Sequence, residues 1–143
     1  MPKTTTGKRM DNNSDYVWDI YEKTPKMSTY TIALAVLSSD YTPVIRQTGK
    51  RNVSVVSGYY PNYPIERMLN TTTKFLSFFE KYFNNTDDLP KVDNLQAIAG
   101  AYGAMENWGL IVYFGDHNYD LLIGHEVAHY WIGNKVTCSN WNE

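Results

Sequence analysis

The chain has 143 residues, of which 43% are hydrophobic and 20% charged, and its formal net charge is −2. This composition is typical of a folded globular protein and excludes an intrinsically disordered chain. The negative charge and the lack of a basic stripe argue against nucleic-acid binding, a single cysteine excludes an internal disulfide, and the longest apolar run, residues 32–37, is far too short to span a bilayer.

The first part of the sequence predicts β structure after a disordered start. Residues 1–16 are polar, with a run of Asp, Asn and Ser, and are expected to be disordered. Residues 17–21 alternate between apolar and polar side chains, which predicts a strand, and residues 30–37 are apolar and β-branched, which predicts a buried strand. A turn at residues 48–50 precedes a further predicted strand at residues 53–56.

The rest of the sequence predicts helices and strands in turn, after a boundary marked by two prolines. Apolar residues recur at helical spacing over residues 65–83, which predicts an amphipathic helix. Residues 92–98 predict a strand, and residues 104–113 predict an edge strand. Residues 120–134 predict a second helix, which is apolar on several sides, as a buried helix must be.

His125, Glu126 and His129 form an H-E-x-x-H motif within the last predicted helix. Residues four apart lie on one face of a helix, so the two imidazoles can bind one zinc ion, a metal that takes histidine nitrogen readily. Glu126 lies beside the first ligand, where a carboxylate can take a proton from the water that the metal activates. The motif therefore predicts zinc-dependent hydrolysis, with a peptide bond as the expected substrate.

The third protein ligand of such a zinc ion is not part of the motif. The metzincin pattern is excluded, because it needs Gly and His where this chain has Ile132 and Lys135. The remaining common solution is a glutamate from a later helix. Glu143 is a possible but less favoured ligand, because the short stretch after His129 leaves little room for a turn and an antiparallel helix. The thiolate of Cys138 is a lesser alternative, since a free cysteine is more often simply buried.

A second motif, Gly103-Ala104-Met105-Glu106-Asn107, lies upstream of H-E-x-x-H. Four further segments follow the same order: TPKMSTY at residues 24–30, LPKVD at residues 89–93, HYWIGNKVT at residues 129–137 and WN at residues 141–142. With these five motifs around H-E-x-x-H, the chain resembles the zinc aminopeptidases of the aminopeptidase N type, the gluzincin exopeptidases. The resemblance covers residues 17–143.

The resemblance implies an α+β fold in two parts. Residues 17–56 would be the final strands of an amino-terminal β domain, and residues 57–143 the first part of a thermolysin-like (zincin) catalytic domain. Residues 1–16 would precede both as a disordered segment. The implied function is zinc-dependent removal of amino-terminal residues from peptides, with a free amino terminus as the feature that marks the substrate.

The resemblance also implies a role for each motif residue. His125 and His129 would bind zinc, Glu126 would act as general base, and Glu106 would bind the α-amino group of the substrate. The backbone of Gly103, Ala104 and Met105 would pair with the peptide as an edge strand. A carboxylate anchor for the amino terminus has no use in internal cleavage, so an endopeptidase is the less favoured alternative.

Two departures from the family raise another alternative. The family's third zinc ligand, a glutamate, would fall beyond residue 143, and so would the tyrosine that stabilises its tetrahedral intermediate, which implies a chain truncated before both. The spacing between Glu106 and His125 is also shorter than in the family, which places His117 in a short turn as an exposed loop residue. A catalytically inactive remnant or isoform that binds a peptide or partner without hydrolysis is therefore the main alternative.

The cellular location is left open. The first residues lack the apolar segment of a secretory signal peptide. The chain has N-glycosylation sequons at Asn12, Asn52, Asn70 and Asn84, which favours descent from a secreted or membrane-anchored ectoenzyme, whereas other members of the family are cytosolic.

Overall fold

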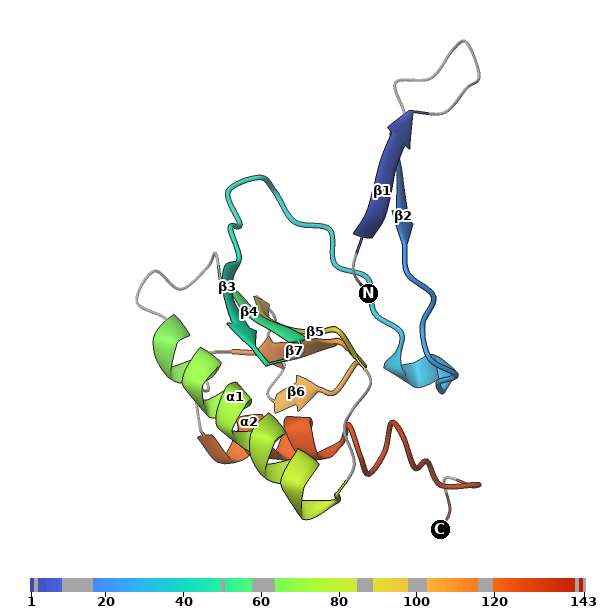
Figure 1. Cartoon of the computed structure of the whole chain (residues 1–143), viewed down its shortest axis with the longest axis vertical. Coiled ribbons are helices and arrows are strands. Elements are labelled where there is room, and N and C mark those ends of the chain that lie inside the picture. The colour runs from blue at the N-terminus through green and yellow to red at the C-terminus, as the bar shows by residue number, and fades with distance from the viewer. Residues whose placement is uncertain are drawn as a thin grey trace.

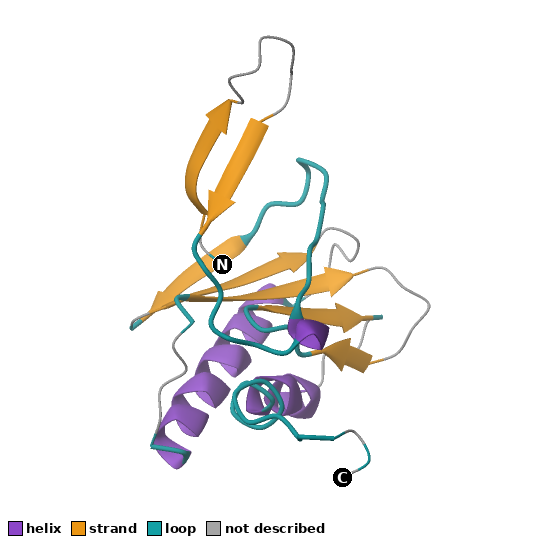
Figure 2. Ribbon diagram, turned by 90° about the vertical axis from the view of Figure 1, so that its right-hand side faces the viewer, coloured by secondary structure: helices purple, strands orange, loops and turns teal. Residues whose placement is uncertain are grey.

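The fold is α+β, with a five-stranded sheet that carries two helices on one face and a two-stranded ribbon at the amino terminus (Figures 1 and 2). The computed structural model describes residues 1, 3–8, 17–49, 51–57, 64–84, 89–97, 103–115, 120–140 and 142. In the ribbon, β1 (Lys3–Lys8) pairs antiparallel with β2 (Val17–Tyr21).

The main sheet has the order β3-β4-β5-β7-β6. Its strands are β3 (Val44–Thr48), β4 (Arg51–Ser57), β5 (Lys91–Ala97), β6 (Gly103–Met105) and β7 (Leu110–Phe114). The central pairs β4–β5 and β5–β7 are parallel, and the outer pairs β3–β4 and β6–β7 are antiparallel. The short strand β6 is therefore an edge strand, hydrogen-bonded to β7 on one side.

Helix α1 (Ile65–Tyr82) is the crossover between the parallel strands β4 and β5. It buries Met68, Leu69, Thr72 and Leu76, at the helical spacing that the sequence predicted. Helix α2 (Asp120–Ala128) packs beside it on the same face of the sheet (Figure 2). Neither of these helices, the two that the described residues form, is long and apolar enough to cross a membrane.

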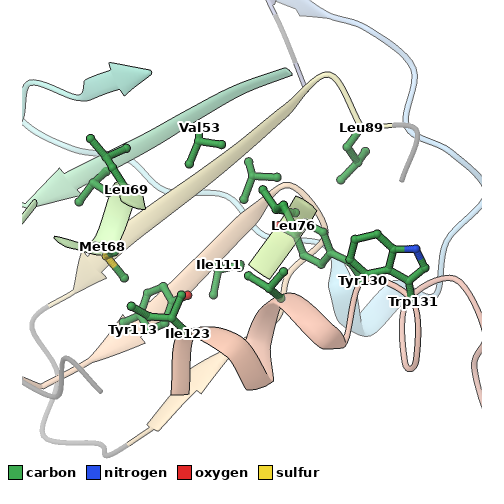
Figure 3. Packing of buried hydrophobic residues seen from close by; sticks show 13 residues of the cluster. Val53, Met68, Leu69, Leu76, Leu89, Ile111, Tyr113, Ile123, Tyr130 and Trp131 are labelled. Atoms are coloured by element: carbon green, nitrogen blue, oxygen red, sulfur yellow. The ribbon is translucent and has the colours of Figure 1, made fainter. Parts of the chain in front are cut away.

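The hydrophobic core lies between the two helices and the sheet (Figure 3). Its members are Val53, Val55, Met68, Leu69, Leu76, Leu89, Val92, Ile111, Tyr113, Ile123, Val127, Tyr130 and Trp131. Because residues just before and just after His125 and His129 belong to this core, packing holds the H-E-x-x-H segment firmly against the sheet.

The two helices are in close contact where Gly124 faces the ring of Phe75. A Cβ atom at Gly124 would lie 2.6 Å from Cζ of Phe75, which is inside van der Waals contact. At the start of α2, Asp120 accepts two hydrogen bonds from Arg67, at 3.1 Å each, and one from Thr71 at 3.1 Å. The Arg67 guanidinium holds the pKa of Asp120 below its ordinary value. These contacts align α2 along α1.

We expect Gly124→Ala to lower the free energy of unfolding. Overpacking of this kind costs about 1–3 kcal/mol, which exceeds the roughly 0.5–1 kcal/mol that alanine gains over glycine inside a helix. Urea denaturation would measure the change. In a Phe75→Leu background the same substitution should cost much less, because the ring that the methyl group meets is gone. A stability increase from Gly124→Ala in the unmutated background would show that the ring yields freely.

The prediction of a buried strand at residues 30–37 is wrong. Thr29–Thr31 forms a short 3-10 helix, and residues 32–37 follow as an exposed loop. Leu34 and Val36 are 89% and 88% exposed. A hydrogen bond from the Trp108 N–H to the Thr31 carbonyl, at 3.1 Å, connects the 3-10 helix to the sheet. The loop that follows passes over the outer face of β5 and β7, and a cavity of about 390 Å³ lies between the loop and these strands. A run of apolar, β-branched residues favours a strand, but a strand forms only where a neighbouring strand offers its backbone.

The polar start is also partly ordered, contrary to expectation. Residues 3–8 form β1, because β-branched threonines suit a strand once a partner such as β2 is present. The strand predicted at residues 17–21 is confirmed as β2. Residues 9–16 lie outside the described residues. The predicted turn is confirmed at Gly49, whose φ of +56° suits glycine, between β3 and β4.

Strand β3 was not predicted, and two of the remaining predictions need correction. The predicted edge strand at residues 104–113 is two strands, β6 and β7, joined by a turn in which Leu110 N–H donates to the Asn107 carbonyl at 2.9 Å. The predicted helix at residues 120–134 ends at Ala128. After Ala128 the backbone changes to the tighter hydrogen-bond pattern of a 3-10 turn, in which the Tyr130 N–H donates to the Val127 carbonyl at 3.2 Å.

Candidate functional site

The two histidines of the motif face one another at the end of α2. His125 lies in the last turn, and the His129 N–H still donates to the His125 carbonyl at 3.2 Å, so the helical register extends to both. Their Nε2 atoms are 3.1 Å apart. A tetrahedral zinc ion with bonds of about 2.0–2.1 Å would separate two ligand nitrogens by roughly 3.3 Å. The pair therefore fits one zinc ion with a small adjustment.

The orientation of His129 is set by the chain that follows it. Its Nδ1 lies 3.0 Å from the Ile132 carbonyl, and an Nδ1–H that donates there leaves the Nε2 lone pair turned toward His125. The turn at Gly133, with φ of +124°, brings that carbonyl back. A Cβ atom at Gly133 would lie 3.0 Å from Nδ1 of His129. The sequence indicated Gly133 only as a helix-end residue. In the structure, a larger residue at this position would press against the His129 ring and shift it.

Glu126 points away from solvent, and its side chain is 3% exposed. Its Oε2 atom has no hydrogen-bond partner within the described part of the chain. Burial, together with the smaller effect of the nearby Glu106 carboxylate, raises the pKa of Glu126 to about 7, although His129 acts in the opposite direction. A buried carboxylate oxygen without a partner is rare in native proteins and marks a place where a water or an ion belongs.

Glu106 follows directly after the edge strand β6, and it is half-buried. Helix α2 packs against β6, which places Glu106 close enough to Glu126 to influence its pKa. Gly103, Ala104 and Met105 are also half-buried. They are the last strand in the sheet order, so their outer edge faces no other described strand.

The structure thus brings the motif glutamate, both histidines and Glu106 to one place, at the end of α2 beside β6. His117 and Glu143 lie outside the described residues, and Cys138 is exposed. Among the residues described, no group of three or more His, Cys, Asp or Glu side chains is arranged to hold a metal ion. The third ligand stays a prediction.

Two residues beside the candidate site were not predicted from the sequence. Tyr30 and Asn134 contact the chain on both sides of the candidate site. Both belong to segments that the family resemblance includes, TPKMSTY and HYWIGNKVT, but no role attaches to them from the sequence. The sequence could have drawn attention to these two residues in one way only: they belong to family motifs whose chemical role was unexplained.

Comparison with known proteins links the chain to one family. The family model described as the peptidase family M1 domain matches residues 67–143. Aminopeptidase Ey of Gallus gallus is 34% identical over 157 residues, which cover 94% of this chain and 15% of the relative. Aminopeptidase Q of Mus musculus is 33% identical over 159 residues, which cover 99% of the chain and 28% of the relative. Endoplasmic reticulum aminopeptidase 2 of Homo sapiens is 33% identical over 157 residues, with 100% and 16% covered.

The chain therefore spans between 15% and 28% of the length of these three relatives. Each aligned stretch is longer than the 143 residues of the chain, so each relative has residues that this chain lacks. That such residues fall between Glu106 and His125 stays a prediction.

Proposed function

The chain belongs to peptidase family M1, a family of metallopeptidases, and from this premise we propose that it carries the zinc-binding helix and the substrate anchor of a zinc-dependent aminopeptidase. The observation that supports this most is the pair of Nε2 atoms 3.1 Å apart beside the buried, unpartnered Oε2 of Glu126. Metal ligands and a general base are the two groups that metal-assisted hydrolysis needs in one place.

Each residue of the H-E-x-x-H motif has a separate role in the proposed reaction. His125 and His129 would hold the zinc ion, which when bound would polarise the scissile carbonyl and lower the pKa of water toward about 7. Glu126 accepts the proton of the attacking water and passes it to the leaving amine. Glu126 can do this from the buried side of the helix end, since its side chain is 3% exposed.

Substrate binding falls to β6 and the residue after it. Glu106 binds the protonated α-amino group of a peptide through its carboxylate. The outer edge of Gly103, Ala104 and Met105 offers backbone N–H and C=O groups to the substrate main chain, in the manner of an added strand. One fixed carboxylate near the metal then selects a free amino terminus and restricts cleavage to the first residue.

The domain assignment is part of the same proposal. Residues 57–143 would form the first part of a thermolysin-like domain, and residues 17–56 the end of a β domain. In the structure β3 and β4 pair with β5, so one sheet extends across the proposed boundary after residue 56.

A comparison of three substrates tests the function. In a full-length context that supplies the predicted third ligand, we expect the zinc-loaded protein to hydrolyse leucine 7-amido-4-methylcoumarin and to leave its N-acetyl derivative and an internally quenched, end-blocked peptide intact. Equal hydrolysis of free and acetylated compounds would contradict the role of Glu106, and cleavage of the blocked peptide would indicate an endopeptidase. Zinc binding without any turnover would favour the non-hydrolytic, peptide-binding alternative.

A further inference from the structure

Asn134 links the segment that follows α2 to the main chain of Glu106, the residue directly after β6. Its side chain is 3% exposed, and its Nδ2 donates to the backbone carbonyl of Glu106 at 2.8 Å. Its backbone N–H donates to the His129 carbonyl at 2.9 Å. One residue therefore contacts the main chain of a proposed metal ligand and the main chain of the proposed substrate anchor.

Tyr30 braces this connection from the other side. Its hydroxyl donates to the Gly133 carbonyl at 3.0 Å and lies 3.4 Å from Oδ1 of Asn134. Its own carbonyl accepts a hydrogen bond from Nδ2 of Asn107 at 3.4 Å. Burial raises the pKa of the Tyr30 hydroxyl, and the Glu106 carboxylate raises it further. The hydroxyl consequently keeps its proton and remains a donor.

Glu106 needs such support because of its place in the fold. It follows a three-residue edge strand that is hydrogen-bonded to β7 on one side only. The bond from Asn134 reaches it from the side of α2. The amide of the next residue, Asn107, ties the same stretch to the Tyr30 carbonyl, but the bond from Asn134 is the one that links the main chain at Glu106 directly to the segment that follows the histidines.

We propose that Asn134 is a positioning residue, braced by Tyr30, that sets the distance between the Glu106 carboxylate and the His125–His129 pair. The proposal rests on the proposed function, since the distance matters only if Glu106 binds an amino terminus while the metal site binds the adjacent carbonyl. It gives a role to the TPKMSTY and HYWIGNKVT segments. Binding geometry of this kind is sensitive, because misplacement by about 1 Å can cost roughly 100-fold in rate.

The test measures affinity for two probes by NMR titration of the zinc-loaded protein. Leucinamide has a free α-amino group, and N-acetylleucinamide does not. We expect Asn134→Ala to weaken leucinamide binding about 10-fold, the loss of one buried hydrogen bond to an anchor, and to leave N-acetylleucinamide unchanged. Zinc affinity should stay within about 3-fold, because the backbone bond to His129 does not depend on the side chain.

Two further variants separate positioning from simple destabilisation. Asn94→Ala removes another buried amide, one that donates to the Ser54 carbonyl at 2.9 Å in the core between β4 and β5. It should lower the unfolding temperature without changing the ratio of the two affinities. Tyr30→Phe removes only the hydroxyl brace and should shift that ratio in the direction of Asn134→Ala by about 3-fold, which also provides a result should Asn134→Ala not fold.

The outcomes distinguish this inference from the function on which it rests. If the unmutated protein binds both probes equally, Glu106 is not an amino-terminus anchor, and the inference falls with it. If the unmutated protein prefers leucinamide, and Asn134→Ala and Tyr30→Phe keep the full preference, the anchor stands and only the positioning role is wrong. An equal change in the ratio from Asn94→Ala would also overturn the inference.

Discussion

Replacing Glu126 with glutamine is expected to reduce turnover of leucine 7-amido-4-methylcoumarin by about 100- to 10,000-fold, the usual contribution of a general base. The amide keeps the shape of the carboxylate but cannot accept the proton of the attacking water. Zinc content, measured by atomic absorption after dialysis, should stay the same, because His125 and His129 are untouched. The variant should fold, since it places no charge in a site whose carboxylate is 3% exposed.

A matched control is Glu66→Gln, the same chemical change on an exposed residue of α1 that pairs with Arg46. It should leave turnover unchanged. Full activity of Glu126→Gln would show that another group takes the proton. Loss of zinc together with activity would instead mean that the Glu126 carboxylate holds the metal, directly or through water.

Replacing either His125 or His129 with alanine is expected to abolish specific zinc binding. Loss of a group that only orients a ligand already costs about 10- to 100-fold in metal affinity, so the loss of a ligand should cost more than about 100-fold. The two Nε2 atoms, 3.1 Å apart, can bind one ion together, and one imidazole alone cannot hold it against a competing chelator. Titration against a chromophoric zinc chelator would measure the affinity of each variant.

The chain offers two controls for this experiment. His117→Ala removes the third histidine of the sequence, which we expect to be a loop residue, and should leave the affinity unchanged. Cys138→Ser removes the exposed thiol and should do the same. A loss of zinc from either control, with no loss from His125→Ala, would place the metal site elsewhere in the chain.

The chemistry of the site could be predicted because it depends on residues close together in sequence. Positions four apart on a helix share a face whatever the rest of the chain does, and the predicted partnership of His125 and His129 follows from that geometry alone. Helix α1 was predictable for the same reason, since Met68, Leu69 and Leu76 recur at the helical period. The boundaries of α1 differ from the prediction by one residue.

Other features depend on which distant segments meet, and local patterns do not encode that. The apolar, β-branched run of residues 30–37 predicts a buried strand, yet residues 32–37 are an exposed loop. The edge strand at residues 104–113 folds back on itself at a turn that ends with Gly109, whose φ is +95°. In both cases the sequence shows which side chains are apolar, but the partner that would cover them is chosen by packing in three dimensions.

The sequence by itself therefore determined the proposed metal-ligand pair, the adjacent glutamate and the two helices, all of which rest on contacts within a turn or two of helix. Only the tertiary structure decided how His129 is turned toward its partner and how Glu106 is held beside it. The Tyr30 hydroxyl reaches the Gly133 carbonyl across 103 positions, and the Asn134 amide reaches the Glu106 carbonyl across 28. Such bonds form because the folded sheet and helices bring their segments together, and no periodicity along the chain can specify them.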